Sequence, residues 1–220
     1  MRDGVKSVHR YFDGLASEWS GRYTRRRDYR ERHDVFAAAI AKALASANVG
    51  SVLEIGCGAH SMFNPDGREG LEYYATDISH EMLKKNSVRA YFFQADFFRL
   101  PLRRSFDMVI LSSVVEWLDE PLLVPMIVSK LVKPGGILLV SYPNNQSLVR
   151  VLERTVVRGI KQLLRKRHYT DLQVPARYCD LADEFERQDF VLKDVVFFGK
   201  KTIFDSRYSS SLRLDVYDKK

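Results

Sequence analysis

The sequence predicts an α/β fold built on a mostly parallel sheet. Two observations carry this prediction: apolar strand segments alternate with helical segments from residue 51 onward, and the first strand runs straight into a glycine-rich turn. The length of 220 residues suits one domain with a substantial core. We expect a helical cap, residues 1–48, and a sheet domain, residues 49–220, that fold as a single unit.

The cap is expected to contain two helices. Across residues 5–20, apolar side chains recur at helical spacing, at Val8, Phe12, Leu15 and Trp19. A second helix is expected from Arg27 to Ala47, and its alanine-rich half should pack on the sheet. These helices lead directly into the first strand.

The first two strands both end in features that suit an adenosine-like ligand. Residues 52–55 are apolar enough for a buried strand, and Gly56 and Gly58 let the chain turn sharply and let a ligand approach the backbone. The second strand, residues 72–77, ends on Asp77, which lies 19 residues after Gly58. An acid at about that distance accepts hydrogen bonds from ribose hydroxyls in nucleotide-binding sheets.

The glycine pattern argues against NAD. A dinucleotide fingerprint needs a third glycine, and Ser61 occupies that position here. Glu54, just before the turn, would repel a pyrophosphate but suits a cationic ligand with an ammonium or sulfonium group. An adenosine cofactor that carries positive charge therefore fits better than a dinucleotide.

Four stretches resemble the motifs of the class I S-adenosylmethionine-dependent methyltransferases, in the right order and spacing: residues 54–58, 75–79, 94–110 and 131–140. The resemblance covers residues 51–142 and is nearest to the small-molecule branch that includes the quinone-biosynthesis methyltransferases. It implies a Rossmann-like class I methyltransferase fold, with a seven-stranded, mostly parallel sheet, helices on both faces and an N-terminal helical cap. It also implies S-adenosyl-L-methionine as the cofactor. His60 stands where the family often has a third glycine, which suggests a short or irregular first helix.

The resemblance also implies a set of cofactor-binding residues: Glu54, Gly56, Cys57, Gly58, Asp77, Ile78, Met82, Asp96, Phe97, Ser112, Tyr11 and Tyr23. Within this set, Asp96 would accept the adenine amino group, and Phe97 would form an apolar wall beside the ring. Tyr11 and Tyr23 would close over the amino-acid end from the cap. A simple core role is the alternative for Cys57 and Met82, and a core or surface role is the alternative for the two tyrosines.

Glu116 is the main candidate for catalysis. Residues 111–118 face the transferred methyl group in the family, and a carboxylate there could contact the acceptor or act as general base. The alternative is an acid at the start of a helix, where the helix dipole favours it. His9 of the cap is a second candidate base. We expect no metal, because the histidines are scattered and Cys57 and Cys179 have no metal-ligand spacing.

The net charge of +7 is concentrated in two segments. Residues 22–32 carry six arginines against two acids, and residues 150–167 carry seven cations against one acid. Across residues 146–167, apolar and cationic side chains are offset by two positions, or about 200° around a helix. A core-facing helix with a solvated basic face explains this pattern; the alternatives are contact with anionic lipid headgroups or an anionic substrate. Nucleic acid fits less well, because no RNA-binding addition accompanies the catalytic domain.

The remaining elements follow from local patterns. Ser79 is expected to cap the helix after the second strand, and Asp96 to end the third strand. A fourth strand, a covering helix over residues 121–131 and a fifth strand launched by the turn 133–136 should follow. Residues 166–180, which include His168, Tyr169 and Tyr178, are expected to be an insertion over the active site. Residues 190–198 and 211–217 should form an antiparallel pair separated by a long loop.

The sequence therefore predicts a methyltransferase that acts on a small molecule, at an oxygen. Methylation at nitrogen or carbon, an RNA or protein acceptor, and a non-catalytic cofactor-binding regulator are the alternatives. No run of about 18 apolar residues and no signal peptide are present, so we expect a cytoplasmic protein, with peripheral contact at the inner membrane face as the alternative. The oligomeric state stays open.

Overall fold

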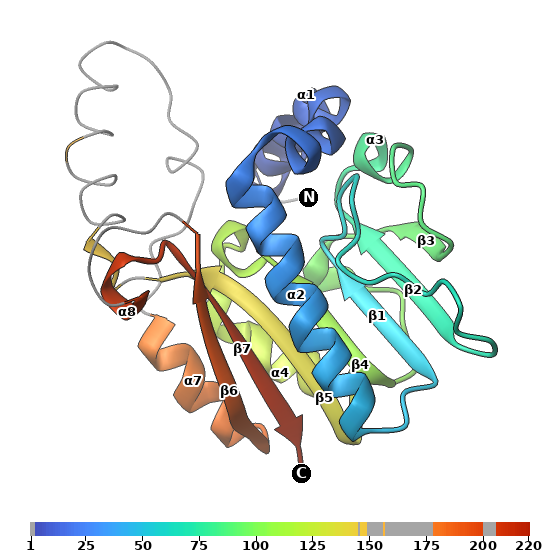
Figure 1. Ribbon diagram of the computed structural model, residues 1–220, viewed down its shortest axis with the longest axis vertical. Helices are drawn as coiled ribbons and strands as arrows, with labels where there is room; N and C mark the ends of the chain where they lie inside the picture. Colours follow the sequence, from blue (N-terminus) through green and yellow to red (C-terminus); the bar gives the residue numbers. More distant parts are fainter. Residues whose placement is uncertain (1–2, 145, 149–155, 157–177, 200–205) are drawn as a thin grey trace.

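The computed structural model describes residues 3–144, 146–148, 156, 178–199 and 206–220 (Figure 1). This part of the chain contains a seven-stranded sheet in the order β3-β2-β1-β4-β5-β7-β6. The strands are β1 Ser51–Ile55, β2 Glu72–Asp77, β3 Tyr91–Gln94, β4 Phe106–Ser112, β5 Val132–Pro143, β6 Phe190–Phe198 and β7 Leu212–Lys219. Neighbours among the first five strands are parallel, and β7 runs antiparallel to β5 and β6. The expected class I methyltransferase fold, including the antiparallel pair at the end of the chain, is confirmed.

The described helices are α1 Asp3–Arg25, α2 Arg27–Ser46, α3 His80–Leu83, α4 Val124–Ser129, α7 Tyr178–Arg187 and α8 Ser206–Ser209. Three short 3-10 helices accompany them: η1 Phe97–Arg99, η2 Val115–Trp117 and η3 Pro121–Leu123. The two cap helices are confirmed, and α2 begins at the predicted residue. The expected helix over residues 121–131 divides into η3 and α4. Helix α7 was not predicted, because its beginning was assigned to the insertion.

Helices cover both faces of the sheet (Figure 1). The side chains of β1 and β4 alternate between the two layers. On one face Phe36 and Ile40 of α2 pack in a cluster with Val52 of β1. On the other face, Leu53 packs in a cluster with Phe185 of α7 and residues of α4. Because side chains of the inner strands are buried on both faces, the strands are apolar almost throughout. This double burial rigidly places the carboxyl ends of β1, β2 and β4.

Local details agree with the predictions in most places. Residues 56–71 contain turns and no helix, as expected from the irregular first connection. Ser79 caps α3, because its side chain accepts a hydrogen bond from the Met82 amide. Strand β3 ends at Gln94, two residues before the predicted Asp96, which instead caps η1. Strand β5 begins at Val132, so residues 133–136 belong to the strand and not to a turn before it.

Two predicted segments cannot be compared with the structure. The basic helix over residues 146–167 and the insertion over residues 166–180 lie almost entirely outside the described residues, and so do His168 and Tyr169. Tyr178 is the first residue of α7. None of the described helices has the length and apolar character needed to span a bilayer.

Candidate active site

A cavity of about 360 Å³ lies at the carboxyl ends of β1, β2 and β4. Helix α1 and the beginning of α2 cover it, as their position above this end of the sheet shows (Figure 1). All the expected cofactor residues except Glu54 line the cavity, and Glu116 lines it as well. The fold therefore brings together residues that are spread over more than a hundred positions of the sequence.

The glycine turn after β1 leaves its backbone open to a ligand. Gly56 and Gly58 have φ angles of 76° and 54°, in the left-handed region that favours glycine. A Cβ atom on Gly56 would lie 2.3 Å from a methyl group of Val114, and one on Gly58 would lie 3.3 Å from the Trp19 ring nitrogen. Cys57 between them is buried. Glycine is therefore required at both positions, and both residues line the cavity with backbone atoms alone.

Asp77 is held rigidly at the end of β2. Its Oδ2 accepts from the Gly58 amide at 2.8 Å, and its Oδ1 accepts from the Ser79 amide at 2.8 Å. Burial raises the pKa of Asp77 to about 6, although these amide donors favour the charged form. A carboxylate has about four acceptor positions, so two backbone bonds leave capacity for ribose hydroxyls.

The side of the cavity expected to take adenine is apolar with one polar group. Met82 and Phe97 are buried there, and Ile78 also lines the cavity. Asp96 accepts a hydrogen bond from the Phe98 amide at 3.1 Å, which fixes its carboxylate at the start of η1. This arrangement offers an acceptor for an exocyclic amine beside an apolar wall.

Aromatic side chains of the cap form the cover. Tyr11 stacks on Trp117 of η2, with ring centroids 5.9 Å apart and an interplanar angle of 28°. Phe12 meets the same indole edge-on at 5.0 Å and meets Trp19 at 5.8 Å. Trp117 was not among the predicted site residues, although it follows Glu116 directly in the sequence.

The second cap tyrosine, Tyr23, lies on the imidazole of His60. The two rings stack with centroids 4.1 Å apart, and both residues line the cavity. Burial raises the pKa of Tyr23 to about 12, so the phenol is neutral at physiological pH. Burial together with the nearby His33 lowers the pKa of His60. His60, which stands where the family often has a third glycine, therefore forms part of the cavity wall.

Glu54 was predicted to face the cationic ligand, and its position corrects that prediction. Its side chain is fully buried and does not line the cavity. Its carboxylate accepts from the amides of Met62 and Phe63 and from the Tyr73 hydroxyl. Burial raises the pKa of Glu54 to about 7. Glu54 thus organises the chain after the glycine turn instead of contacting the ligand.

His9, the second candidate base, does not line the cavity. Its Nε2 lies 3.2 Å from a carboxylate oxygen of Asp13, one helical turn further along α1. The other oxygen of Asp13 accepts a hydrogen bond from the Ser79 hydroxyl at 2.5 Å. His9 therefore belongs to the contact that holds α1 on the β2–α3 connection, and Glu116 is the better placed candidate.

Glu116 lies at the far wall of the cavity, in η2. Its side chain is buried, with 3 % exposed. The segment that carries it begins after Ser112, which ends β4 and lines the cavity. Ser113 follows with a positive φ of 55°, donates its amide hydrogen to the Ser141 hydroxyl at 3.0 Å, and accepts a hydrogen bond from Arg32. Nothing in the described part of the chain groups three metal-ligating side chains.

Residues 53–140 match the family described as a methyltransferase domain. The sheet order, the glycine turn and the acid after β2 lie in the same segment. The chain has the class I methyltransferase fold, and it is an S-adenosylmethionine-dependent methyltransferase. Its cofactor is S-adenosylmethionine.

Solved structures share the fold of this methyltransferase over nearly its whole length. Magnesium protoporphyrin IX methyltransferase from Synechocystis PCC 6803, with bound S-adenosylhomocysteine, is 17% identical, with a TM-score of 0.75, 99% of this chain covered and 100% of that chain. The N-methyltransferase NodS from Bradyrhizobium japonicum WM9 is 13% identical, with a TM-score of 0.67 and 99% of both chains covered. A possible histamine N-methyltransferase from Thermotoga maritima is 17% identical, with a TM-score of 0.66, 96% of this chain covered and 99% of that chain. No curated protein matches the sequence.

Proposed function

We propose that this methyltransferase transfers the methyl group of S-adenosylmethionine to an oxygen atom of a small-molecule acceptor. The observation that carries the proposal is the covered cavity of about 360 Å³, which lies in the size range of small-molecule sites. Helix α1 closes this cavity with aromatic side chains, which leaves little access for a folded macromolecule. The resemblance to the quinone-biosynthesis branch supports oxygen as the acceptor atom.

The walls of the cavity support one placement of the cofactor. The ribose would bind Asp77, and the adenine would lie against Phe97 with its amino group on Asp96. The methionine portion would then follow the backbone of the glycine turn, covered by Tyr11 and Tyr23. In this orientation the sulfonium methyl group points toward η2 and Glu116.

The reaction requires alignment more than chemical assistance. The acceptor oxygen attacks the methyl carbon in line with the carbon–sulfur bond, so the new carbon–oxygen bond forms as the carbon–sulfur bond breaks. The bonding electron pair leaves with sulfur, which gives neutral S-adenosylhomocysteine. Glu116 takes the hydroxyl proton, and the protein's main contribution is to hold both reactants in the reactive geometry.

A panel of phenols and matched aromatic amines tests the proposal. Each compound is incubated with the protein and S-adenosylmethionine, and mass spectrometry identifies the methylated atom. O-methylated products are expected, and kcat should fall by about a hundredfold in Glu116→Gln while the affinity for S-adenosylhomocysteine is retained. Glu120→Gln is the control, because this exposed acid lies four positions away and does not line the cavity.

Two results would contradict the proposal. Products methylated at nitrogen alone would move the acceptor to the amine class, in which two of the compared structures are named. Loss of S-adenosylhomocysteine binding in Glu116→Gln would remove the general-base assignment, because the side chain would then serve the cofactor.

A further inference from the structure

Three arginines of the cap line the cavity, and the proposed reaction does not use them. Arg22 lies in the last turn of α1, Arg26 joins α1 to α2, and Arg32 lies on α2. All three belong to the arginine-rich segment of residues 22–32. The sequence shows only that positive charge is concentrated in this segment. In the fold, these three arginines of the segment line the cavity.

The three side chains differ in how their charge is balanced. Arg26 forms an ion pair with Asp28, with a nitrogen–oxygen distance of 2.6 Å. Arg22 donates to the Tyr29 hydroxyl at 3.3 Å and lies over the Trp19 ring, neither of which is an anion. Within the described residues neither Arg22 nor Arg32 forms an ion pair. Two positive charges at the cap side of the cavity therefore have no partner of opposite charge in the part of the chain that the structure describes.

Arg32 also has a donor without an acceptor. One terminal nitrogen donates to the Ser113 hydroxyl, while its Nε is inaccessible to solvent and has no hydrogen-bond partner among the described residues. Tyr23 beside it is a neutral phenol and supplies no counter-charge. Because this Nε is out of reach of a ligand in the cavity, Arg32 would meet an anion through its terminal nitrogens.

The acids of the cavity lie mainly on the opposite side. Asp77, Asp96, Glu116 and Asp119 come from the carboxyl ends of the sheet and the segments that follow them. Asp28 is the acid from the cap, and it is paired with Arg26. The cavity therefore has an acidic floor and a cationic cover, with the rings of Trp19, Phe12 and Trp117 beside them.

We propose that Arg32, assisted by Arg22, binds an anionic oxygen group, a carboxylate or a phosphate, carried by the methyl acceptor. The planar fork of a guanidinium matches these two groups, and Arg32 is already oriented by Ser113. The apolar body of the acceptor then packs against the aromatic side chains, with its reacting oxygen toward Glu116. This inference rests on the proposed function, because it assumes that the acceptor occupies this cavity.

Calorimetry with simple anions tests the subsite without knowledge of the natural acceptor. The protein is first saturated with S-adenosylhomocysteine and then titrated with benzoate, with inorganic phosphate, and with benzamide as the neutral counterpart of benzoate. The variants are Arg32→Gln, Arg32→Lys and, as matched control, Arg27→Gln, which removes an exposed arginine outside the cavity.

Benzoate or phosphate should bind the wild type and Arg27→Gln equally well. Either anion should bind at least about tenfold more weakly to Arg32→Gln, the change that loss of a charged hydrogen bond produces. Arg32→Lys should be intermediate, since it keeps the charge and loses the fork. The anion that binds more tightly identifies the group as carboxylate or phosphate.

Equal binding of benzoate and benzamide without binding of phosphate, no binding of either anion, or unchanged anion binding in Arg32→Gln would each overturn the inference. The S-adenosylhomocysteine titration separates this failure from a failure of the proposed function, because a wild type that binds no cofactor product contradicts the latter. It also checks folding of the variants. If Arg32→Gln does not fold, Arg32→Lys against wild type decides.

Discussion

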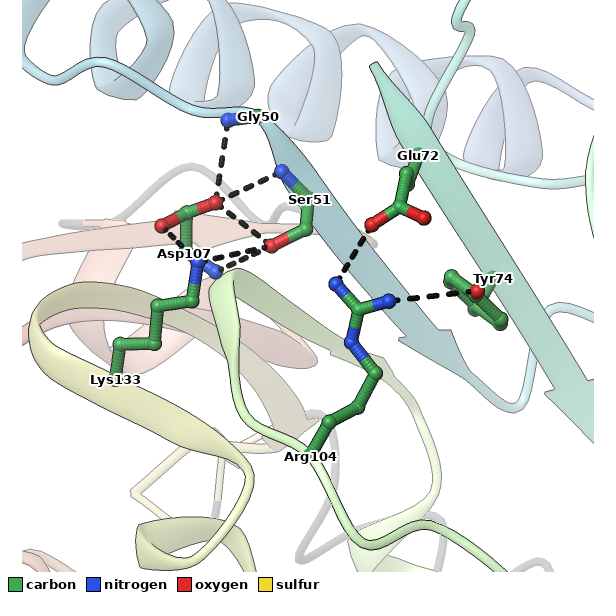
Figure 2. Close-up of polar contacts among 7 residues, drawn as sticks. All are labelled: Gly50, Ser51, Glu72, Tyr74, Arg104, Asp107 and Lys133. Carbon is green, nitrogen blue, oxygen red and sulfur yellow. Dashed lines mark hydrogen bonds and ion pairs between the residues drawn. The ribbon is translucent and has the colours of Figure 1, made fainter. Parts of the chain in front are cut away.

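The parallel strands begin at one edge of the sheet, the amino edge, and end at the other, the carboxyl edge. The two edges differ in how their charged side chains are balanced. At the amino edge, Asp107 lies among four donors: the amides of Gly50 and Ser51, the Ser51 hydroxyl and the Lys133 ammonium (Figure 2). Beside it, Arg104 donates to Glu72 at 2.7 Å and to the Tyr74 hydroxyl at 3.4 Å. Each of the four charged side chains named here forms an ion pair with another of them.

The carboxyl edge lacks this internal balance. Burial raises the pKa of Asp77 to about 6 and that of Glu54 to about 7, whereas the pKa of Asp107 is lowered at the other edge. Arg32 has no ion-pair partner among the described residues, and a Cβ atom at Gly56 would clash with Val114. The same sheet thus has one edge stabilised by its own contacts and one edge that a ligand must complete, at some loss of stability.

The largest predicted effect is the loss of stability when Gly56 is replaced by alanine. The comparison is the same replacement at Gly135, which has a similar φ angle. Gly56→Ala should lower the free energy of unfolding by about 4 kcal/mol, because left-handed strain adds to the clash with Val114. Gly135→Ala should cost only about 1 to 2 kcal/mol, since Gly135 has a φ of 74° and no atom within 4 Å of a new Cβ. Urea unfolding measures both.

The double variant Gly56→Ala, Val114→Ala refines this prediction. It should recover the part of the lost stability that comes from the clash and leave the backbone strain. Equal losses in Gly56→Ala and Gly135→Ala would mean that the turn after β1 is no more crowded than the amino edge.

The second prediction concerns pH. The pKa of Glu54 rises on folding from 4.5 to about 7, so the folded state binds more protons than the unfolded state between these values. Stability from this group is fully present below pH 4.5 and is lost as the pH rises through 7, by about 3 kcal/mol in total. In Glu54→Gln this part of the decline should disappear from urea unfolding measured between pH 5 and pH 8, while the part that Asp77 contributes up to about pH 6 remains.

The matched control for that experiment is Glu72→Gln at the amino edge. Arg104 lowers the pKa of Glu72, so this acid is charged in both states above pH 5 and adds no slope there. A decline with pH that persists unchanged in Glu54→Gln would show that the buried carboxylate is not its source.

Asp107 should show the opposite pH dependence with a smaller effect. Asp107→Asn should lose about 2 kcal/mol of stability at pH 7, because an amide cannot accept from the Lys133 ammonium and the Ser51 donors together. The pKa of Asp107 is lowered by these partners, so its contribution exists above the ordinary value of 3.8 and is lost as the pH falls below it. The difference between wild type and variant should therefore shrink in acid, and a constant difference would contradict the ion-pair account.

The smallest effect is expected from the exposed ion pair of the same edge. Arg104→Gln should change stability by less than about 1 kcal/mol, since Arg104 and Glu72 are both solvent-exposed. Thermal unfolding at low and high salt measures the change, which should vanish at high salt. A loss as large as that in Asp107→Asn would mean that both clusters of the amino edge are equally structural.

Most of the fold could be predicted because the buried positions of each element carry apolar residues, and their spacing can be recognised in the sequence. Strands β2 and β6 have the predicted bounds, since apolar runs end at Asp77 and begin at Phe190. The two cap helices are long enough for their spacing to be clear. Helix α7 was missed because it is short and follows a stretch without apolar periodicity. The end of β3 was misplaced because Asp96 continues the strand pattern while its side chain caps η1.

The site was less predictable, because which face of an element meets the cavity depends on packing. Glu54 was misassigned because alternation in a doubly buried strand places it with Val52, toward Phe63 and Tyr73, and not toward the turn. Arg32 was missed because a run of arginines does not show which one the crossing of α1 and α2 directs inward. Such residues can be found only once the cap is placed on the sheet.

One measurement tests the contrast between the edges most directly: calorimetric titration with S-adenosylhomocysteine of Asp77→Asn and Asp107→Asn, beside urea unfolding of both. We expect Asp77→Asn to bind at least about tenfold more weakly while its stability at pH 8 changes little, because removal of a buried charge offsets the loss of one of its two amide hydrogen bonds. Asp107→Asn should bind as the wild type does and lose stability. Unchanged binding in Asp77→Asn, or weakened binding in a folded Asp107→Asn, would contradict the assignment of the carboxyl edge to the cofactor.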